Sequence, residues 1–255
     1  MADLLALIKL LLFLLLTVTI CVIYLIIYGV INLLRLPYEP WRNLFMKCWS
    51  KMTATIFRLH ITNRGEPPKA PFFLVCNHLS YLDIIPIYFT VNCTFVAKKE
   101  VRKWPFLGFM ISMVGVIFVN RRSKKDVIRV NRLIVQSISK YQGVVVFPEG
   151  TSSGGADVLP YRSSLLEVAA QNRIPVYAAS IQYATSENDP PAADSVCFYG
   201  ARHSFPEHLF LMAKNRRIDC SITFDPVPVI DSDRKNLATH LHQKTKKIFI
   251  PTFSS

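Results

Sequence analysis

Residues 72–83 read FFLVCNHLSYLD, a continuous apolar run followed by a turn that carries a histidine and an aspartate. A run that is apolar at every position is typical of a strand covered by helices on both faces of a mostly parallel sheet. We predict further strands at 94–97, 114–120, 143–147, 175–183, 195–200 and 218–224. Helical patterns occupy 84–89, 105–112, 123–140, 163–171 and 233–250. This alternation predicts one α/β domain with a mixed, mostly parallel sheet flanked by helices.

The N-terminal segment is far more apolar than the rest of the chain. No charged residue occurs over the 25 positions from Leu10 to Leu34, and about 20 apolar residues cross a bilayer core as a helix. A secretory signal is disfavoured, because the run is too long and lacks a small-x-small cleavage site. A second, amphipathic helix follows over 39–60. Its apolar face packs on the main domain or lies among lipid headgroups.

The two N-terminal helices allow two membrane arrangements. Either the first helix crosses the bilayer, or breaks at Gly29 and Pro37 fold the segment into a helical hairpin within one leaflet. We assign residues 1–60 to membrane-anchoring helices and residues 61–255 to the α/β domain. Only Asp3 and Lys9 precede the apolar run, whereas five basic residues follow it up to position 58. The positive-inside rule therefore places the α/β domain on the cytoplasmic side of the cell membrane or another cytoplasm-facing membrane.

The net charge of +13 suits nucleic acid or an anionic membrane surface. Neither zinc-finger spacing nor an aromatic RNA-binding signature accompanies it, so we expect a phospholipid surface as partner and no nucleic acid. The six cysteines are dispersed without paired spacing. They are predicted to be reduced, mostly buried thiols and not disulfides or metal ligands. The histidines form no metal-binding pattern, so we expect no metal site.

His78 and Asp83 admit two interpretations. Ser80 and Asp83 fit the Ser-x-x-Asp signature of a helix start, and Pro86 is tolerated only in a first turn. Residues five apart on a helix do not share a face, so a His–Asp contact requires His78 to lie on the strand-to-helix turn. There, Asp83 at the helix start folds back, fixes the imidazole tautomer and makes the other nitrogen a better base.

Two further strand ends carry polar groups. The strand GVVVF ends in Phe147-Pro148-Glu149-Gly150-Thr151, which is a good type I turn, but its carboxylate lies where α/β sheets bind ligands. The run of hydroxyl residues and glycines after it offers donors to an anion.

Another strand, VGVIFVN, is followed directly by Arg121 and Arg122, and a guanidinium is suited to binding phosphate. We prefer Arg121 as a ligand and a solvated role for Arg122.

In order and spacing, NHLSYLD, GVIFVNR, FPEGT and IPVYAASIQY resemble the four sequence blocks of the glycerolipid acyltransferases. The closest type is lysophosphatidate acyltransferase, and the resemblance covers about residues 60 to 230. The first and third blocks are specific in combination. The resemblance implies a glycerol-phosphate acyltransferase-like fold.

The resemblance also implies roles for single residues. His78 is the base and Asp83 its orienting carboxylate. Arg121 binds the phosphate of the acceptor. Glu149 and Gly150 help to bind the acceptor, with Thr151 completing the pocket. In the fourth block, Ile174 and Pro175 match an apolar element that shapes the site.

One position departs from the family pattern. The third block usually continues Thr-Arg-Ser, whereas this chain has Ser152 where the arginine stands. A hydroxyl still donates a hydrogen bond but adds no charge, which leaves the head group of the acceptor open. Arg162 falls where relatives carry a basic residue and is a candidate for compensation.

The function implied is transfer of a fatty acyl group from acyl-CoA or acyl carrier protein to the free sn-2 hydroxyl of 1-acyl-glycerol-3-phosphate, giving phosphatidic acid for phospholipid synthesis. No cofactor is expected. Alternatives are acylation of another lysolipid, such as a lyso-amino-acid lipid, and a lipid-binding membrane protein without turnover. The chain has no Gly-x-Ser-x-Gly elbow, P-loop or Gly-x-Gly-x-x-Gly, so serine hydrolysis and nucleotide cofactors are not indicated.

Overall fold

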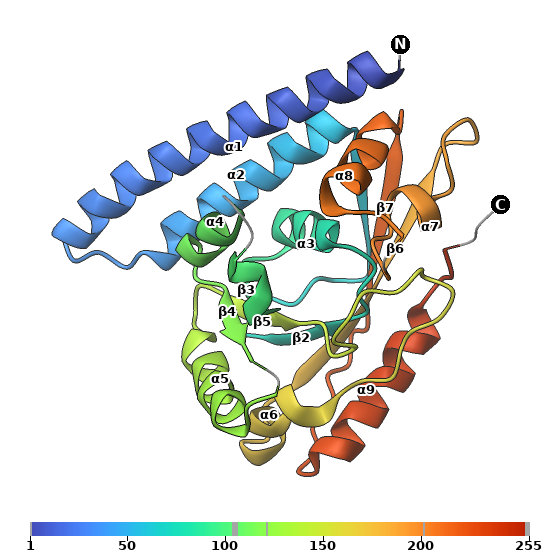
Figure 1. Ribbon diagram of the computed structural model, residues 1–255. Helices are drawn as coiled ribbons and strands as arrows, with labels where there is room; N and C mark the ends of the chain where they lie inside the picture. Colours follow the sequence, from blue (N-terminus) through green and yellow to red (C-terminus); the bar gives the residue numbers. More distant parts are fainter. Residues whose placement is uncertain (1, 104–106, 121, 201, 253–255) are drawn as a thin grey trace.

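A computed structural model describes residues 2–103, 107–120, 122–200 and 202–252 of the chain (Figure 1). Its seven-stranded sheet has the order β1-β7-β6-β2-β5-β3-β4. The strands are β1 (Leu59–Arg64), β2 (Phe73–Cys76), β3 (Cys93–Lys98), β4 (Ile117–Val119), β5 (Gly143–Val146), β6 (Val176–Thr185) and β7 (Ile218–Phe224). Among these strands of the described residues, β6 and β7 pair in antiparallel fashion and the other neighbours pair in parallel. The predicted mixed, mostly parallel sheet is confirmed.

Helices cover both faces of the sheet (Figure 1). The α-helices are α1 (Ala2–Leu33), α2 (Glu39–Phe57), α3 (Ile84–Thr90), α4 (Leu107–Met113), α5 (Lys124–Ser137), α6 (Glu167–Gln171), α7 (Ala192–Ser195), α8 (Phe205–Lys214) and α9 (Arg234–Ile248). Short 3-10 turns are η1 (Tyr81–Asp83), η2 (Lys99–Lys103) and η3 (Ser163–Leu165). One core lies between the sheet and α2, α3 and α8, and the other lies between the sheet and α5, α6 and α9.

Strand β2 lies at the centre of the sheet between β5 and β6. Phe73 and Val75 face the core beneath α5, α6 and α9, whereas Leu74 and Cys76 face the opposite core. All four side chains are buried. This two-sided burial explains why the run FFLVC is apolar without alternation, and it fixes the point from which the next residues leave the sheet.

Helices α1 and α2 form a hairpin along one side of the domain (Figure 1). Of the described helices, α1 alone is long and apolar enough to cross a membrane. A narrow stripe of α1 is buried, including Thr17, Tyr24 and Ile31, while most of its leucines and isoleucines are exposed. Because that stripe packs on α2 and α8, the helix lies against the domain and does not project from it.

Polar contacts attach α1 to the domain along its length. Near one end, the Lys9 ammonium donates to the carbonyls of Ala213 (3.1 Å) and Asn215 (2.6 Å), at the C-terminus of α8. In the middle, Trp49 of α2 donates to the Thr17 hydroxyl. Farther along, Tyr24 donates to a carbonyl at the end of α4. Lys9 satisfies carbonyls that the last turn of α8 leaves without intrahelical partners.

The strand predicted at 195–200 is wrong. Residues 192–195 form α7, and the chain then continues without sheet pairing. A short apolar run does not by pattern alone distinguish a strand from a packed loop. Here, Cys197 and Val196 are buried in the core beneath α8, and Phe198 donates its N–H to the Leu79 carbonyl.

Two edge strands also differ from expectation. The amphipathic helix predicted over 39–60 ends at Phe57, and its last residues belong to β1, whose residues are largely exposed because it is the edge strand beside β7. At the other edge, only Ile117–Val119 of the run 114–120 pair with β3. An edge strand pairs on one side only, so β1 tolerates exposed polar residues.

Lys9 supplies a test of how α1 is held. Replacing Lys9 with Met leaves two carbonyls of α8 without their donor, so the free energy of unfolding should fall by about 1–3 kcal/mol. Thermal unfolding in detergent micelles measures this, with Leu12→Met on the exposed side of α1 as the matched control. Equal melting temperatures for all three proteins would contradict the attachment.

Candidate active site

The His78 imidazole and the Asp83 carboxylate form a direct pair. The Nδ1 atom of His78 lies 2.7 Å from Oδ2 of Asp83. The His78 side chain is 24% exposed and the Asp83 side chain is fully buried. A buried carboxylate accepts the Nδ1 proton, which leaves the lone pair of Nε2 as the reactive base. The pair predicted from the sequence is therefore brought together.

The sheet places His78 at the junction of two strands. Strands β2 and β5 are parallel neighbours, so the residues that follow them leave the same edge. Between β2 and His78, the Asn77 side chain donates to the Ile181 carbonyl (3.0 Å) and accepts from the Ile181 N–H (2.8 Å). Asn77 thus extends the pairing with β6 by one step after the β2 backbone has turned away.

Asp83 also organises the turn that contains His78. Its Oδ2 atom accepts the backbone N–H groups of Leu79 (2.8 Å) and Ser80 (3.1 Å). Its Oδ1 atom accepts the hydroxyl of Tyr183 at 3.0 Å. The contact expected for a helix start and the predicted His–Asp contact are both present, because the one carboxylate makes both.

Glu149 lies directly beside this turn but is not open to solvent. Its Oε1 atom accepts the backbone N–H of His78 at 2.9 Å, and the side chain is 2% exposed. Desolvation raises the pKa of Glu149 to about 8, although hydrogen bonds from the His78 and Leu159 backbones oppose the shift. The His78 carbonyl in turn accepts the N–H of Ser153. The FPEGTSS segment therefore holds the histidine backbone on both sides.

The Phe147 ring packs against one face of the His78 imidazole. The His78 and Phe147 rings stack with centroids 4.3 Å apart and planes 16° apart. Phe147 stacks in turn on Phe95 of β3 at 5.8 Å. This column restricts the imidazole plane, while Asp83 restricts its rotation within that plane.

The remaining predicted ligands have different placements. Gly150 is buried, has φ +78°, and closes the predicted turn by donating to the Phe147 carbonyl. Positive φ is where glycine is favoured. Thr151 is exposed beside it. Arg121 lies outside the described residues.

Ser152 and Arg162 both adjoin the FPEGT turn. The Ser152 hydroxyl donates to the Phe198 carbonyl and so ties this turn to the segment after α7. The Arg162 backbone donates to the Pro148 carbonyl at 2.9 Å, and its side chain is exposed. The hydroxyl of Ser152 is therefore engaged within the protein, whereas Arg162 presents a cation next to the turn.

Sequence reasoning gave no role to three residues of the site, which are Asn77, Phe147 and Tyr183. All three lie inside the quoted motifs, Asn77 in NHLSYLD, Phe147 in FPEGT and Tyr183 at the end of IPVYAASIQY. Tyr183 stands 100 residues from its partner Asp83, and only the register of β6 brings the two together.

The model of the acyltransferase family matches residues 58–182, which include the dyad, the FPEGT turn and most of β6. Residues 58–182 of the chain therefore match an acyltransferase domain. This acyltransferase domain begins just before β1 and contains every predicted catalytic and ligand residue.

Relatives with two different acceptors resemble the chain. The 1-acyl-sn-glycerol-3-phosphate acyltransferase of Neisseria gonorrhoeae is 34% identical over 122 residues, 47% of this chain and 48% of that protein. The matched region thus spans about half the length of that relative. The lyso-ornithine lipid O-acyltransferase of Pseudomonas aeruginosa is 26% identical over 216 residues, 83% of this chain and 82% of that protein.

The fold also matches a solved structure. The crystal structure of the 1-acyl-sn-glycerophosphate acyltransferase PlsC from Thermotoga maritima superimposes with a TM-score of 0.63 at 21% identity. The match covers 95% of both chains. It therefore includes the N-terminal hairpin as well as the sheet.

The raised pKa of Glu149 predicts a specific pH dependence of stability. The unfolded chain loses this proton near the ordinary value of 4.5, whereas the folded chain keeps it up to about 8. The folded state binds more protons across that window, so its stability falls as the pH rises from about 5 to 8. Glu149→Gln has no such proton and should lose this part of the slope in thermal unfolding.

The exposed Glu187 provides the control, because Glu187→Gln should keep the native slope. Each kcal/mol corresponds to roughly 2–4 °C in a chain of this size, so melting curves at closely spaced pH values resolve the effect. Identical slopes in the native and Glu149→Gln proteins would refute the assignment.

Proposed function

We propose that this protein is a membrane-bound O-acyltransferase that acylates a lysophospholipid. The observation that carries the proposal is the 2.7 Å contact between His78 Nδ1 and the buried Asp83 carboxylate, with the imidazole partly exposed. A pure lipid-binding protein has no use for an oriented base. The acyltransferase family and the named relatives support acyl transfer as the reaction class.

In the proposed reaction, His78 Nε2 takes the proton of the acceptor hydroxyl as that oxygen attacks the carbonyl carbon of an acyl thioester. The carbon–sulfur bond then breaks, and the His78 imidazolium gives the proton to the departing sulfur, so that the donor leaves as a free thiol. Asp83 holds the tautomer and stabilises the imidazolium. The donor is acyl-CoA or acyl carrier protein, and no further cofactor enters the scheme.

The preferred acceptor is 1-acyl-glycerol-3-phosphate, with Arg121 binding its phosphate and Glu149, Gly150 and Thr151 shaping the pocket. A second acceptor class, the lyso-ornithine lipids, is favoured by one observation. Ser152 replaces the family arginine, and its hydroxyl is bonded to the Phe198 carbonyl. One cation for the phosphate is thereby missing, and the Pseudomonas relative acts on a lyso-ornithine lipid according to its name.

We further propose that the hairpin inserts into one leaflet on the cytoplasmic side. Helix α1 is attached through Lys9, Thr17 and Tyr24 to elements of the folded domain. A helix that crossed the bilayer would carry its middle turns away from that domain. An α1 that lies flat presents its exposed apolar side to the acyl chains and keeps the other side on the protein.

The catalytic assignment is tested by thiol release from an acyl thioester with lysophosphatidate or lyso-ornithine lipid as acceptor. His78→Ala removes the base and should lower kcat by about 100- to 10,000-fold. Asp83→Asn keeps the shape but misorients the imidazole and should also lower kcat. His240→Ala changes an exposed histidine of α9 and should leave the rate unchanged.

The outcomes separate the candidate functions. Release with lysophosphatidate supports the preferred acceptor, and release with lyso-ornithine lipid alone moves the assignment to that class. Equal release by the native and His78→Ala proteins would overturn the mechanism.

The one-leaflet arrangement is tested by labelling single cysteines in sealed vesicles with the cytoplasmic face outward. Ala2→Cys and Leu36→Cys, each made with Cys48→Ser, place thiols at the two ends of α1. Both should react with a membrane-impermeant maleimide from outside. Reaction of the Leu36→Cys protein alone would instead indicate that α1 crosses the membrane.

A further inference from the structure

Tyr183 contributes the one hydrogen bond that Oδ1 of Asp83 receives within the described part of the chain. Its hydroxyl donates at 3.0 Å, and the tyrosine side chain is 1% exposed. The other carboxylate oxygen, Oδ2, receives His78 and two backbone N–H groups. One oxygen of Asp83 therefore binds His78 and the backbone of its turn, and the other oxygen binds Tyr183.

The pairing of β6 within the sheet fixes the position of Tyr183 next to Asp83. Strand β6 continues beyond its last β2 partner, because β7 pairs with it in antiparallel fashion from Ala179 to Thr185. Asn77 clamps β6 at Ile181, and Tyr183 is the next residue on the same face of the strand. Its position is therefore fixed by the strand that also fixes the start of the NHLSYLD turn.

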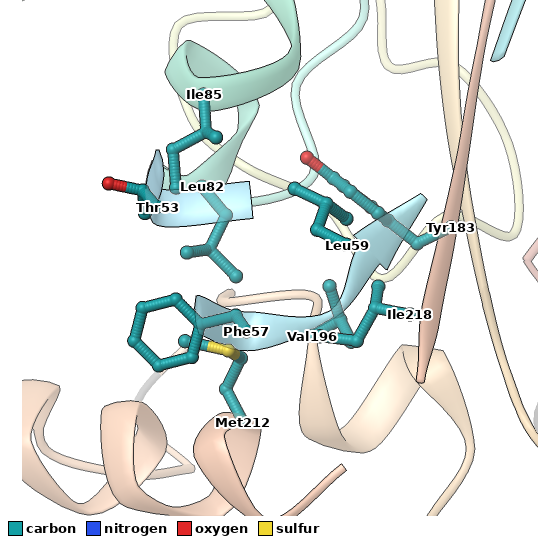
Figure 2. A pocket seen from close by; sticks show the side chains of 9 residues that line it. All are labelled: Thr53, Phe57, Leu59, Leu82, Ile85, Tyr183, Val196, Met212 and Ile218. Carbon is teal, nitrogen blue, oxygen red and sulfur yellow. The ribbon is translucent and has the colours of Figure 1, made fainter. Parts of the chain in front are cut away.

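The tyrosine ring forms part of the wall of an apolar cavity. Figure 2 shows the ring extending from β6, with its hydroxyl at the far end from the strand. Leu82, which precedes Asp83 directly, and Ile85 line the same cavity. Because the surroundings are apolar, the hydroxyl has a strong preference for the Asp83 carboxylate over other partners.

Other titratable groups also face Asp83. They are Glu149 after β5 and three buried cysteines, Cys76 on β2, Cys197 after α7 and Cys220 on β7. Burial raises the pKa of each thiol, to about 12 for Cys197. The thiols therefore stay neutral in the working range, and Glu149, with a pKa of about 8, is the neighbour that changes charge there.

We propose that Tyr183 is a positioning residue of the dyad, which acts through Asp83 by fixing the carboxylate plane and moderating its basicity toward His78. This inference rests on the proposed acyl transfer. A donor on Oδ1 withdraws negative charge from the carboxylate, so the imidazolium form of His78 is less favoured. Tyr183 thereby sets both the geometry of the dyad and the pH dependence of the proposed reaction.

Tyr183→Phe removes only the hydroxyl and keeps the ring on the cavity wall. We expect kcat to fall about tenfold with KM nearly unchanged, since the acceptor does not touch Tyr183. We also expect the acidic limb of the kcat/KM profile to move to higher pH. Substitution of 3-fluorotyrosine at position 183 keeps the fold and makes a stronger donor, so the limb should move to lower pH.

A structural role alone predicts different results. It would lower thermal stability and activity without moving the acidic limb, and it would add to the effect of Asp83→Asn. A role through Asp83 predicts that Tyr183→Phe has little further effect once Asp83→Asn is present. Additive losses in this double-mutant cycle, or an unmoved limb in both position-183 variants, would overturn the proposal.

The matched control is Tyr161→Phe. It removes the hydroxyl of a partly buried tyrosine, which donates to Thr245 at 2.8 Å, while the tyrosine packs against the core on the other face of the sheet. Both Tyr→Phe variants lose one hydrogen bond donated by a tyrosine hydroxyl, but only one of these bonds reaches Asp83. Tyr161→Phe should therefore keep the native pH profile, and Glu149→Gln establishes how much of that profile belongs to Glu149.

A measurement that needs no substrate separates this inference from the proposed function. Two-bond 1H–15N spectra of histidine-labelled protein report the tautomer of His78, identified by its loss in His78→Ala. We expect the nitrogen shifts of His78 to change in Tyr183→Phe and to stay native in Tyr161→Phe. Unchanged shifts would refute the positioning role, whereas absent thiol release from the native protein would refute the proposed function alone.

Discussion

The buried carboxylate of Asp83 is the interaction on which the site depends. A charge taken out of water is costly unless hydrogen bonds replace the lost solvation. Four donors do so here, from the His78 ring, the backbone of the following turn and the Tyr183 hydroxyl. The orientation of His78, the start of η1 and the path of the turn all follow from satisfying one carboxylate. Glu149 performs the complementary task on the histidine backbone.

The dyad was predictable because its determinants are local. The histidine, the capping signature and the apolar strand lie within twelve consecutive residues, and their geometry needs little beyond a strand followed by a helix. The role of Ser152 was not predictable in the same way. Its hydroxyl bonds to the Phe198 carbonyl, 46 residues away, in a segment whose apolar pattern suggested a strand. The contact of Tyr183 with Asp83 was equally unpredictable, because it depends on how far β6 continues past its last β2 partner.

Helix α8 shows the opposite case, in which a local signal existed. Ser204 and Glu207 have the spacing of a capping box, and Pro206 stands in the first turn. These are helix-start signals in the plain sequence, yet no helix was predicted there. Helix α1 is intermediate. Its length follows from composition, and Thr17, Tyr24 and Ile31 recur every seven residues, a spacing that indicates packing against another helix.

The paired hydrogen bonds of Asn77 stiffen the turn that carries His78. Turns at the end of a strand are ordinarily the first parts of a fold to move. Here an amide side chain stands in for a peptide group, so the sheet ladder reaches the residue next to His78. An amide presents its donor and its acceptor on separate atoms, as a peptide group does, whereas an ionised aspartate has no donor and the hydroxyl of serine or threonine has both on a single atom. His78 is consequently carried by the stiffness of the sheet, and movements of the N-terminal hairpin are poorly transmitted to it.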